Sequence, residues 1–344
     1  MQASTCLILD IGSGTQDVLL YQEGMELENC PKFILPAPAR VVATRIRELT
    51  KAGRDIYLCG QNMGGGFWRA LKAHQDAGLR VFAHPEAALA LGDDLEHIAG
   101  FGITLTTNPP LTASAVMLTD FDAGFWQGFL QHAGLPAPDF VLACVQDHGF
   151  FPGKSNRLSR FAYWERFMRE EQGKFAALLY TEPPTQMTRL QCLRKAIGLG
   201  IVADTGAAAM LGALFDPGVA ASSRQEGVLV VNIGNSHTIA FLVRDERVWG
   251  VYEHHTGYID QQKLMQHLQD FRQGILANST VFDDGGHGCV VAPEAGSGFS
   301  RTVVLGPQRA MLHGADVEFL APGGDMMLAG CFGLLKGWQE YVQI

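Results

Sequence analysis

The feature that most limits the fold is residues 5–21, two apolar runs joined by a short glycine turn. Residues 6–11 are apolar except for Asp10, and a short run of this kind is typical of a buried strand. Residues 12–14, Gly-Ser-Gly, allow the chain to reverse its direction, and residues 18–21 form the second run. We therefore predict a β-hairpin with glycine at its tip.

The polar residues around this turn suit the binding of an anion and a cation. Gly12 and Gly14 let backbone N–H groups come close to an anion. Ser13 and Thr15 add hydroxyl groups. Asp10, at the end of the first run, can hold Mg²⁺ directly or through water. An ordinary tight hairpin with a capping aspartate is the alternative, and this stretch alone does not separate the two.

A second copy of the pattern lies at residues 227–243. Again an apolar run ends in a small polar residue, Asn232, and Ile-Gly, a short polar turn and another apolar run follow. The candidate anion-binding residues of this turn are Gly234, Asn235, Ser236, His237 and Thr238. This weak internal repeat predicts two related domains that face one nucleotide.

Residues 10–15 match the motif Asp-x-Gly-x-Gly-Thr, and through it the chain resembles the actin-like ATPase superfamily of sugar kinases, heat-shock chaperones, actin and exopolyphosphatases. Further segments resemble, in the same order, the connecting, second phosphate and adenosine motifs of that superfamily; they lie at 202–212, 232–238, 302–307 and 323–330. The resemblance implies an α/β fold of two ribonuclease-H-like domains with ATP and Mg²⁺ in the cleft between them.

The resemblance also implies roles for individual residues. Asp10 and Asp204 would hold the metal ion, and together with Asp147 they are the predicted catalytic residues. The predicted phosphate-binding residues are Gly12, Ser13, Gly14, Thr15, Asn232, Gly234, Asn235, Ser236, His237 and Thr238. The residues predicted to flank adenosine are Gly306, Gly323 and Gly324. The implied activity is ATP-dependent phosphoryl transfer to a small molecule, or ATP hydrolysis.

Three of these residues have a second interpretation. Asp147 ends a predicted buried strand, where it or His148 could orient a hydroxyl group or a water molecule, but it could also cap a turn. Asp204 precedes a predicted helix and is therefore also an ordinary N-cap. Asn232 stands where the superfamily usually has aspartate, and an amide adds no negative charge. A nucleotide-binding regulatory module with little or no turnover is therefore the alternative function.

More narrowly, the chain resembles a branch of the superfamily whose members carry the label "putative pyruvate formate-lyase activating enzyme". Enzymes with that activity are radical enzymes that hold an iron–sulfur cluster on a Cys-x₃-Cys-x₂-Cys run. The cysteines of this chain are Cys6, Cys30, Cys59, Cys144, Cys192, Cys289 and Cys331. No two of them lie within five residues of each other, so a radical activase is disfavoured.

Length predicts two domains, and the net charge disfavours one class of partner. The 344 residues exceed the size of about 250–300 residues at which one core usually splits. We place one ribonuclease-H-like domain at 1–215, with an irregular insertion near 84–138, and the second at 216–344. The net charge of −9, without a long basic run, argues against nucleic acid as a partner.

Cysteine usage and the start of the sequence bear on location and partners. Seven scattered cysteines indicate reduced thiols and a cytoplasmic protein. The sequence does not begin with the charged and apolar regions of a secretion signal, and no apolar stretch is long enough to span a bilayer. We expect a nucleotide and an unidentified small molecule as partners and no membrane, and leave a homodimer open.

Other polar or glycine-rich segments have a plain structural alternative. The glycines at 64–66 could bind phosphate, but a flexible connection is favoured. Residues 154–169 contain one lysine and four arginines among aromatic residues, which predicts an anion site or an amphipathic helix with a solvated basic face. His254 and His255 are adjacent on a predicted strand and cannot face one metal ion. Residues 283–289 are rich in metal-ligand types, but their glycines favour a loop.

Overall fold

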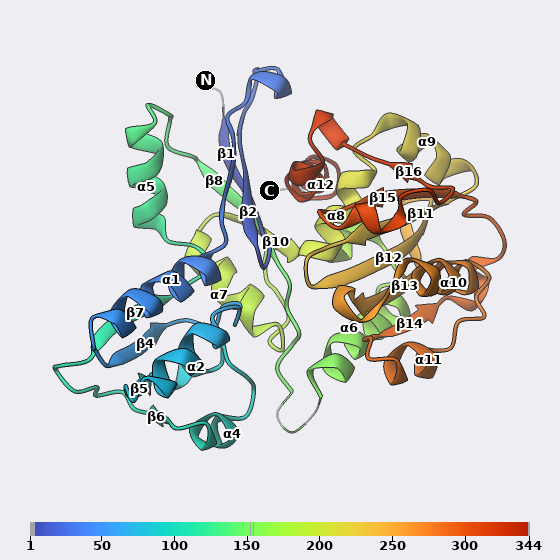
Figure 1. Cartoon of the computed structure of the whole chain (residues 1–344). Coiled ribbons are helices and arrows are strands. Elements are labelled where there is room, and N and C mark those ends of the chain that lie inside the picture. Colours follow the sequence, from blue (N-terminus) through green and yellow to red (C-terminus); the bar gives the residue numbers. More distant parts are fainter. Residues whose placement is uncertain (1–3, 152, 154, 343–344) are drawn as a thin grey trace.

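The computed structural model describes residues 4–151, 153 and 155–342. These residues form two six-stranded sheets, one four-stranded sheet and the helices that cover them (Figure 1). The first two strands, β1 (Thr5–Ile11) and β2 (Thr15–Gln22), pair antiparallel, which confirms the predicted hairpin. Side chains on both faces of β1 are buried, as its continuous apolar run predicted.

The N-terminal sheet has the strand order β3-β2-β1-β8-β10-β9. Strands β1 to β3 pair antiparallel, β8 and β10 continue the sheet in parallel with β1, and β9 pairs antiparallel at the edge. The remaining bounds are β3 Lys32–Pro36, β8 Phe140–Val145, β9 Leu179–Tyr180 and β10 Gly200–Asp204. Because β1, β8 and β10 are parallel, Asp10, Asp147 and Asp204 come together at one edge of the sheet.

The C-terminal sheet has the order β14-β13-β12-β11-β15-β16. Its first four strands pair antiparallel, and β15 and β16 continue in parallel with β11. The bounds are β11 Val228–Ile233, β12 His237–Arg244, β13 Arg247–His255, β14 Gly288–Val291, β15 Arg301–Leu305 and β16 Glu318–Phe319. The order β13-β12-β11-β15 repeats β3-β2-β1-β8, so the weak sequence repeat is a repeat of structure. The predicted α/β fold of two ribonuclease-H-like domains is confirmed by this strand order.

A four-stranded parallel sheet of order β6-β5-β4-β7 lies beside the N-terminal sheet (Figure 1). Its strands are β4 Ile56–Gly60, β5 Val81–Ala83, β6 Ile103–Leu105 and β7 Ser114–Leu118. Its helices are α1 Pro38–Lys51, α2 Trp68–Asp76, α3 Pro85–Ala88 and α4 Leu95–Gly100. The sheet begins before residue 84, and the region 84–138 contains short helices and strands rather than irregular structure. The division of the chain into domains stays a prediction.

Two helices rich in small residues lie between the six-stranded sheets. Helix α8 (Thr205–Ala213) follows β10, and α12 (Ala329–Tyr341), near the end of the chain, packs on it and on β1 and β8 of the N-terminal sheet. A Cβ atom on Gly212 would lie 2.0 Å from the carbonyl oxygen of Ala329, and one on Gly333 would lie 1.8 Å from that of Ala208. The glycines therefore allow the helix backbones to approach more closely than any side chain permits.

The basic segment near 154–169 forms a helix, α6 (Asn156–Glu170), that packs on the C-terminal sheet. Arg160 is 1% exposed and fully enclosed, whereas Arg166 and Arg169 lie at the surface. Phe161 and Trp164 join the main core. The predicted amphipathic helix is therefore confirmed, except that one of its basic side chains is buried. Lys154, which belongs to the same segment, lies outside the described residues.

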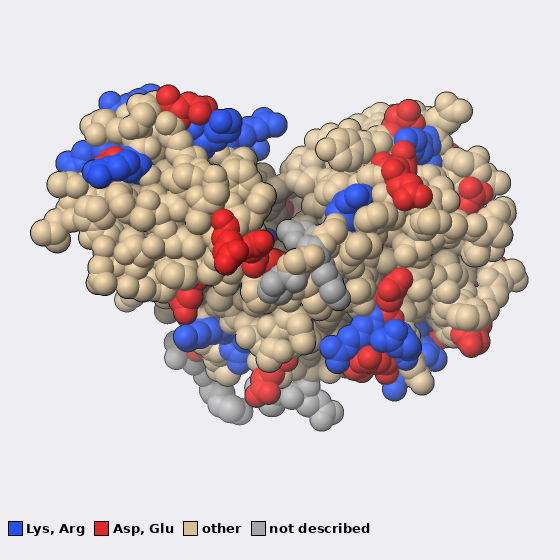
Figure 2. Space-filling view, turned by 90° about the horizontal axis from the view of Figure 1, so that it is seen from below, with Lys and Arg blue, Asp and Glu red and all other residues tan. Residues whose placement is uncertain are grey.

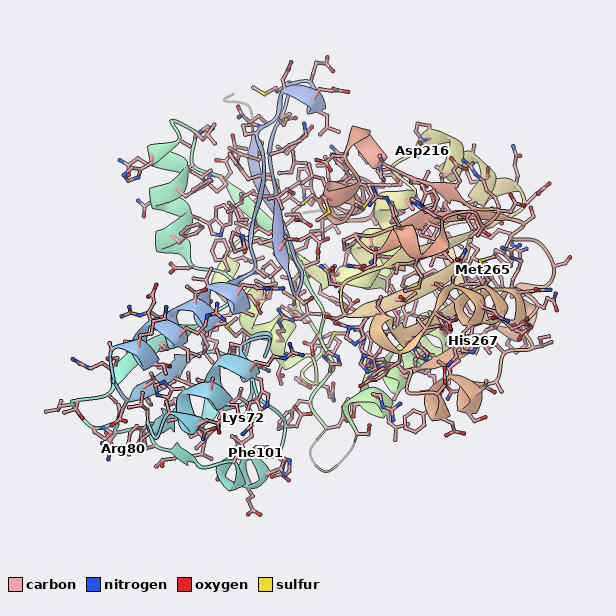
Figure 3. The ribbon with its side chains drawn as sticks, in the orientation of Figure 1. Lys72, Arg80, Phe101, Asp216, Met265 and His267 are labelled. Carbon is pink, nitrogen blue, oxygen red and sulfur yellow. The ribbon has the colours of Figure 1, made fainter. Side chains whose placement is uncertain are left out.

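The remaining helices are α5 Ala123–His132, α6 Asn156–Glu170, α7 Thr188–Ile197, α9 Pro217–Gln225, α10 Gln261–Arg272 and α11 Asn278–Asp283. Figure 3 marks Lys72 on α2 and His267 on α10, which belong to opposite halves of the molecule. Within residues 4–151, 153 and 155–342, no helix has the length and apolar character needed to cross a membrane.

Candidate functional site

A pocket of about 440 Å³ lies where the two hairpin turns meet the four-stranded sheet. Figure 2 shows the surface hollowed between the two halves, with acidic and basic side chains interspersed around it. The predicted site residues that line the pocket are Asp10, Gly12, Ser13, Gly14, Thr15, Asp147, Asn232, Gly234, Asn235, Ser236, His237 and Gly306. A volume of this size is typical of a small-molecule site.

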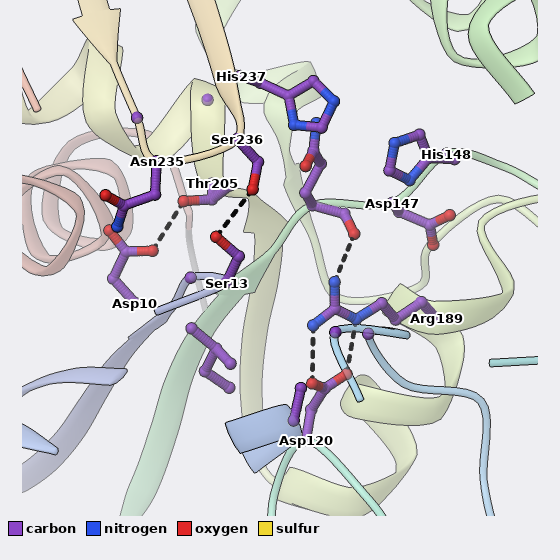
Figure 4. Close-up of a pocket in the computed structure, with 18 of the residues that line it drawn as sticks. Asp10, Ser13, Asp120, Asp147, His148, Arg189, Thr205, Asn235, Ser236 and His237 are labelled. Atoms are coloured by element: carbon purple, nitrogen blue, oxygen red, sulfur yellow. Dashed lines mark hydrogen bonds and ion pairs between the residues drawn. The ribbon is translucent and has the colours of Figure 1, made fainter. Parts of the chain in front are cut away.

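The two turns face each other across the pocket and have the same internal geometry. The Gly12 N–H donates to the carbonyl of Thr15, and the Gly234 N–H donates to that of His237, at 2.9 Å in both cases. The Ser236 hydroxyl donates to the Ser13 oxygen at 3.0 Å (Figure 4). The predicted pairing of turns from two related domains is therefore present.

The tips of both turns have backbone groups that can bind an anion. Among the described residues, no protein group accepts a hydrogen bond from the backbone N–H of Ser13, Gly14, Asn235 or Ser236. Unpaired N–H groups that converge on a pocket favour negative charge.

Asp10 lies at the end of β1, beside the first turns of two helices. Its Oδ1 accepts from the Thr205 hydroxyl of α8 at 2.7 Å (Figure 4) and from the Cys144 thiol at 3.2 Å. A Cβ atom on Gly330 of α12 would lie only 2.0 Å from its Oδ2, so only glycine leaves room for this carboxylate. Burial raises the pKa of Asp10, and the Thr205 hydroxyl counteracts part of that effect. A cation at this carboxylate would remove the cost of burying its charge.

Asp204, the second predicted metal ligand, does not line the pocket. Its carboxylate accepts from both terminal nitrogens of Arg160, at 2.5 and 2.9 Å, and caps α8 through the Gly206 N–H at 2.9 Å. Arg160 also donates to Glu253 at 3.0 Å. The N-cap that sequence analysis left open is therefore present, and the oxygens of Asp204 are already engaged. A metal-binding role for Asp204 stays a prediction.

Asp147, the predicted base, reaches the pocket wall but is itself held by backbone groups. Its oxygens accept from the Gly149 N–H at 2.7 Å and from the Leu190 N–H at 2.9 Å. This is the capped turn that sequence analysis gave as the alternative. Burial raises the pKa of Asp147. Nearby, Arg189 donates to Asp120 through two hydrogen bonds of 2.7 Å, which places a neutralised ion pair on the pocket wall (Figure 4).

The predicted adenosine segment is only partly at the pocket. Gly306 lines it and has a φ of 97°, and a Cβ atom there would lie 2.3 Å from the carbonyl oxygen of Ile233. Gly323 and Gly324 do not line it, and a Cβ atom on Gly323 would meet the ring of Phe332. Within the predicted segment 323–330, the residues that line the pocket are instead Met326, Met327, Ala329 and Gly330. Thr238, predicted to bind phosphate, is buried and pairs with the hydroxyl of Thr256.

A group of histidines that sequence analysis did not bring together stands at the pocket. His148 and His237 line the pocket, and the ring of His287 lies within 5.0 Å of that of His237 and 5.9 Å of that of His148, between centroids. Burial lowers the pKa of His237 to about 4 and that of His287 to about 3, so both rings are neutral at pH 7. The one sequence sign of His287 was the ligand-rich run at 283–289. His254 and His255 diverge, since His254 contacts Asp284.

Comparison with known proteins identifies a family and looser structural likenesses. The family model described as "Putative pyruvate format-lyase activating enzyme (DUF1786)" matches residues 63–311, which is 249 of 344 residues. No curated protein matches the chain.

Among solved structures, the chain is similar to an activator of 2-hydroxyisocaproyl-CoA dehydratase from Clostridium difficile with bound ADPNP. The two are 10% identical over 99% of this chain and 98% of the activator, with a TM-score of 0.32. It is similar to MreB 5 of Spiroplasma citri bound to AMPPNP at 10% identity over 98% and 95%, with a TM-score of 0.32. The chain is also similar to an exopolyphosphatase-like protein, at 10% identity and a TM-score of 0.30. That alignment covers 89% of this chain and 66% of the exopolyphosphatase-like protein. These likenesses are loose, whereas the strand order shows the fold directly.

Proposed function

We propose that this chain, which belongs to the family described as a putative pyruvate format-lyase activating enzyme (DUF1786), binds ATP with Mg²⁺ between its two hairpin turns and transfers the terminal phosphoryl group to a small molecule or to water. One observation carries the proposal. Two turns of equal geometry, one from each related sheet, meet across a pocket with their hydroxyl groups 3.0 Å apart and their tip N–H groups unpaired.

The residues present fit a phosphate chain and one cation. The unpaired N–H groups of Ser13, Gly14, Asn235 and Ser236 provide donors on two sides, as in other glycine-rich phosphate sites. Asp10 offers a carboxylate to Mg²⁺ on the same wall. Mg²⁺, when bound, neutralises charge on the phosphate oxygens. Because magnesium is usually held by one or two carboxylates with several waters, Asp10 is sufficient as the main protein ligand.

The acceptor would occupy the far side of the pocket, between the turns and the four-stranded sheet. That side is lined by the glycines at 64–66, the Asp120–Arg189 ion pair and Asp147. A carboxylate has about four acceptor positions, so Asp147 keeps capacity for a substrate proton beside its two backbone partners. Burial raises the pKa of Asp147 above that of a free aspartate, which is the direction that makes a carboxylate a better general base.

The cysteines do not support the radical chemistry that the family description suggests. All seven are free thiols. Some His, Cys, Asp or Glu side chains lie close enough together, in groups of three or more, to share an ion. Among the described residues, no such group contains a cysteine. The free thiols instead fit a reducing, cytoplasmic compartment.

Calorimetric titration with ATP, with and without Mg²⁺, tests the proposal. We expect binding that depends on Mg²⁺ and is lost in Asp10→Ala but kept in Asp76→Ala, since Asp76 is an exposed aspartate on α2 that pairs with Lys72. No binding under either condition would contradict the proposal. Binding without phosphate release in the presence of candidate acceptors would favour the regulatory alternative, which the neutral Asn232 at the pocket wall supports.

A further inference from the structure

Three histidine side chains from distant segments converge on one wall of the pocket. His148 follows β8 in the N-terminal half, His237 begins β12, and His287 precedes β14. Each offers a ring nitrogen, and these nitrogens all lie within 4.8 Å of one another. Figure 4 shows the rings of His148 and His237 near each other above the Asp147 turn.

Two of these rings have no hydrogen-bond partner. Both nitrogens of His237 and both nitrogens of His287 are buried, and none has a partner among the described residues. Leaving a buried polar group unpaired costs about 1–3 kcal/mol. Such a cost is rarely kept unless water or an ion satisfies the group.

We propose that His148, His237 and His287 together bind one divalent transition-metal ion, at a site separate from the proposed magnesium position at Asp10. Imidazole nitrogen suits Zn²⁺ and related ions, whereas Mg²⁺ prefers oxygen. In a tetrahedral site with bonds of about 2.05 Å, ligand nitrogens are roughly 3.3 Å apart. Nitrogens that already lie within 4.8 Å need only small ring rotations to reach that spacing.

The segment that carries His287 is held in place from two sides. The backbone N–H of His287 donates to the backbone carbonyl of Glu253 at 2.9 Å. Arg157 of α6 donates to the carbonyls of Phe282 and Gly286, also at 2.9 Å. Fixing a ligand through its own backbone lowers the cost of ordering it when the ion binds.

The charges around the three rings favour a cation. The buried Arg160 contacts two carboxylates, Asp204 and Glu253, so that the three side chains together carry one net negative charge. Glu253 is 1% exposed and also accepts from Trp164 and Gln146. An uncompensated negative charge in an interior is costly, and a neighbouring cation reduces that cost.

The site would have two consequences for the molecule. Three protein ligands leave a fourth position for water or a phosphate oxygen, as in catalytic zinc sites. That position would face the pocket, because His148 and His237 line it. His148 belongs to the N-terminal half and the other two ligands to the C-terminal half, so the ion would also join the two halves.

The test uses metal-free full-length protein without nucleotide. Co²⁺ is followed by its visible absorbance and Zn²⁺ by calorimetry. We expect one ion per chain, and a loss of affinity of at least tenfold in His237→Ala and in His287→Ala. His132→Ala is the control, since this exposed histidine on α5 lies outside the pocket.

Thermal unfolding provides a second measurement that does not depend on activity. Zn²⁺ should raise the midpoint of the wild type and of His132→Ala and leave those of His237→Ala and His287→Ala unchanged. Equal binding by the wild type and both cluster variants would overturn the proposal, as would no binding of either ion at micromolar concentrations. Because no nucleotide is present, a failure here is distinct from a failure of ATP binding in the presence of Mg²⁺.

Discussion

Replacing Arg160 by methionine should destabilise the protein strongly, because this guanidinium is the only cation that the described structure places against two buried carboxylates. Its terminal nitrogens donate to Asp204 at 2.5 and 2.9 Å, and its Nε donates to Glu253 at 3.0 Å. All three side chains are almost completely buried. Methionine has a similar length but no charge, so the variant leaves both carboxylates without a cation, with only neutral hydrogen-bond donors beside them.

Removing one partner of a buried ion pair typically costs about 3–5 kcal/mol. At an m-value of about 3 kcal/mol/M, that loss would lower the urea midpoint by about 1–1.7 M. Arg166→Met is a matched control on the same helix, since Arg166 and its partner Glu170 are about half exposed. An exposed pair of this kind contributes little, so we expect a midpoint close to that of the wild type.

The destabilisation should also depend on pH. Burial alone would raise the pKa of Glu253, but the Arg160 charge and the three neighbouring histidines together outweigh it and hold the pKa well below its usual range. Glu253 therefore adds stability in the wild type above the pKa of an unfolded glutamate. Without Arg160, burial raises the pKa of Glu253, and the variant loses stability as the pH rises. The difference from the wild type should be larger at pH 8 than at pH 5, and a variant no less stable than Arg166→Met would refute the reasoning.

Two further predictions concern the pocket and the small sheet. Gly330→Ala should weaken ATP binding at least about tenfold, or about 1.4 kcal/mol, because the new methyl group would displace the Asp10 carboxylate. The control is Gly128→Ala on α5, which should bind ATP like the wild type because a Cβ atom there meets nothing within 4 Å. Equal calorimetric affinities of the two variants for ATP would contradict the prediction. His74 is fully buried, and its Nδ1 lies beside the Thr50 hydroxyl. Because that hydroxyl donates its hydrogen to the carbonyl of Ile46, it must accept a hydrogen bond from Nδ1. The neutral ring therefore has an unprotonated Nε2, which has no partner among the described residues. Burial lowers the pKa of His74, so unfolded chains bind its proton first and the free energy of unfolding should fall as the pH drops below about 6.5. His74→Asn should lose that part of the pH dependence in urea titrations at pH 7 and pH 5, and an unchanged slope would show that the ring does not titrate as argued.

Local pattern determined the parts of this protein that lie within one stretch of chain. Apolar runs on either side of a glycine turn specify a hairpin wherever they occur, so both hairpins and their repeat could be predicted. Asp10 could be placed at the pocket for the same reason, since it stands at the end of the first apolar run, directly before the glycine turn. The helix that follows Asp204 could likewise be predicted from its own stretch of chain.

Only the tertiary structure decided which distant side chains meet. Arg160 sits in a basic segment that looks solvated in sequence, and its burial follows from how α6 packs on the C-terminal sheet beside Glu253. The engagement of Asp204 and the convergence of His148, His237 and His287 follow in the same way. A sequence pattern records neighbours along the chain, whereas partners from separate sheets are set by strand order, register and helix packing, which no single stretch contains.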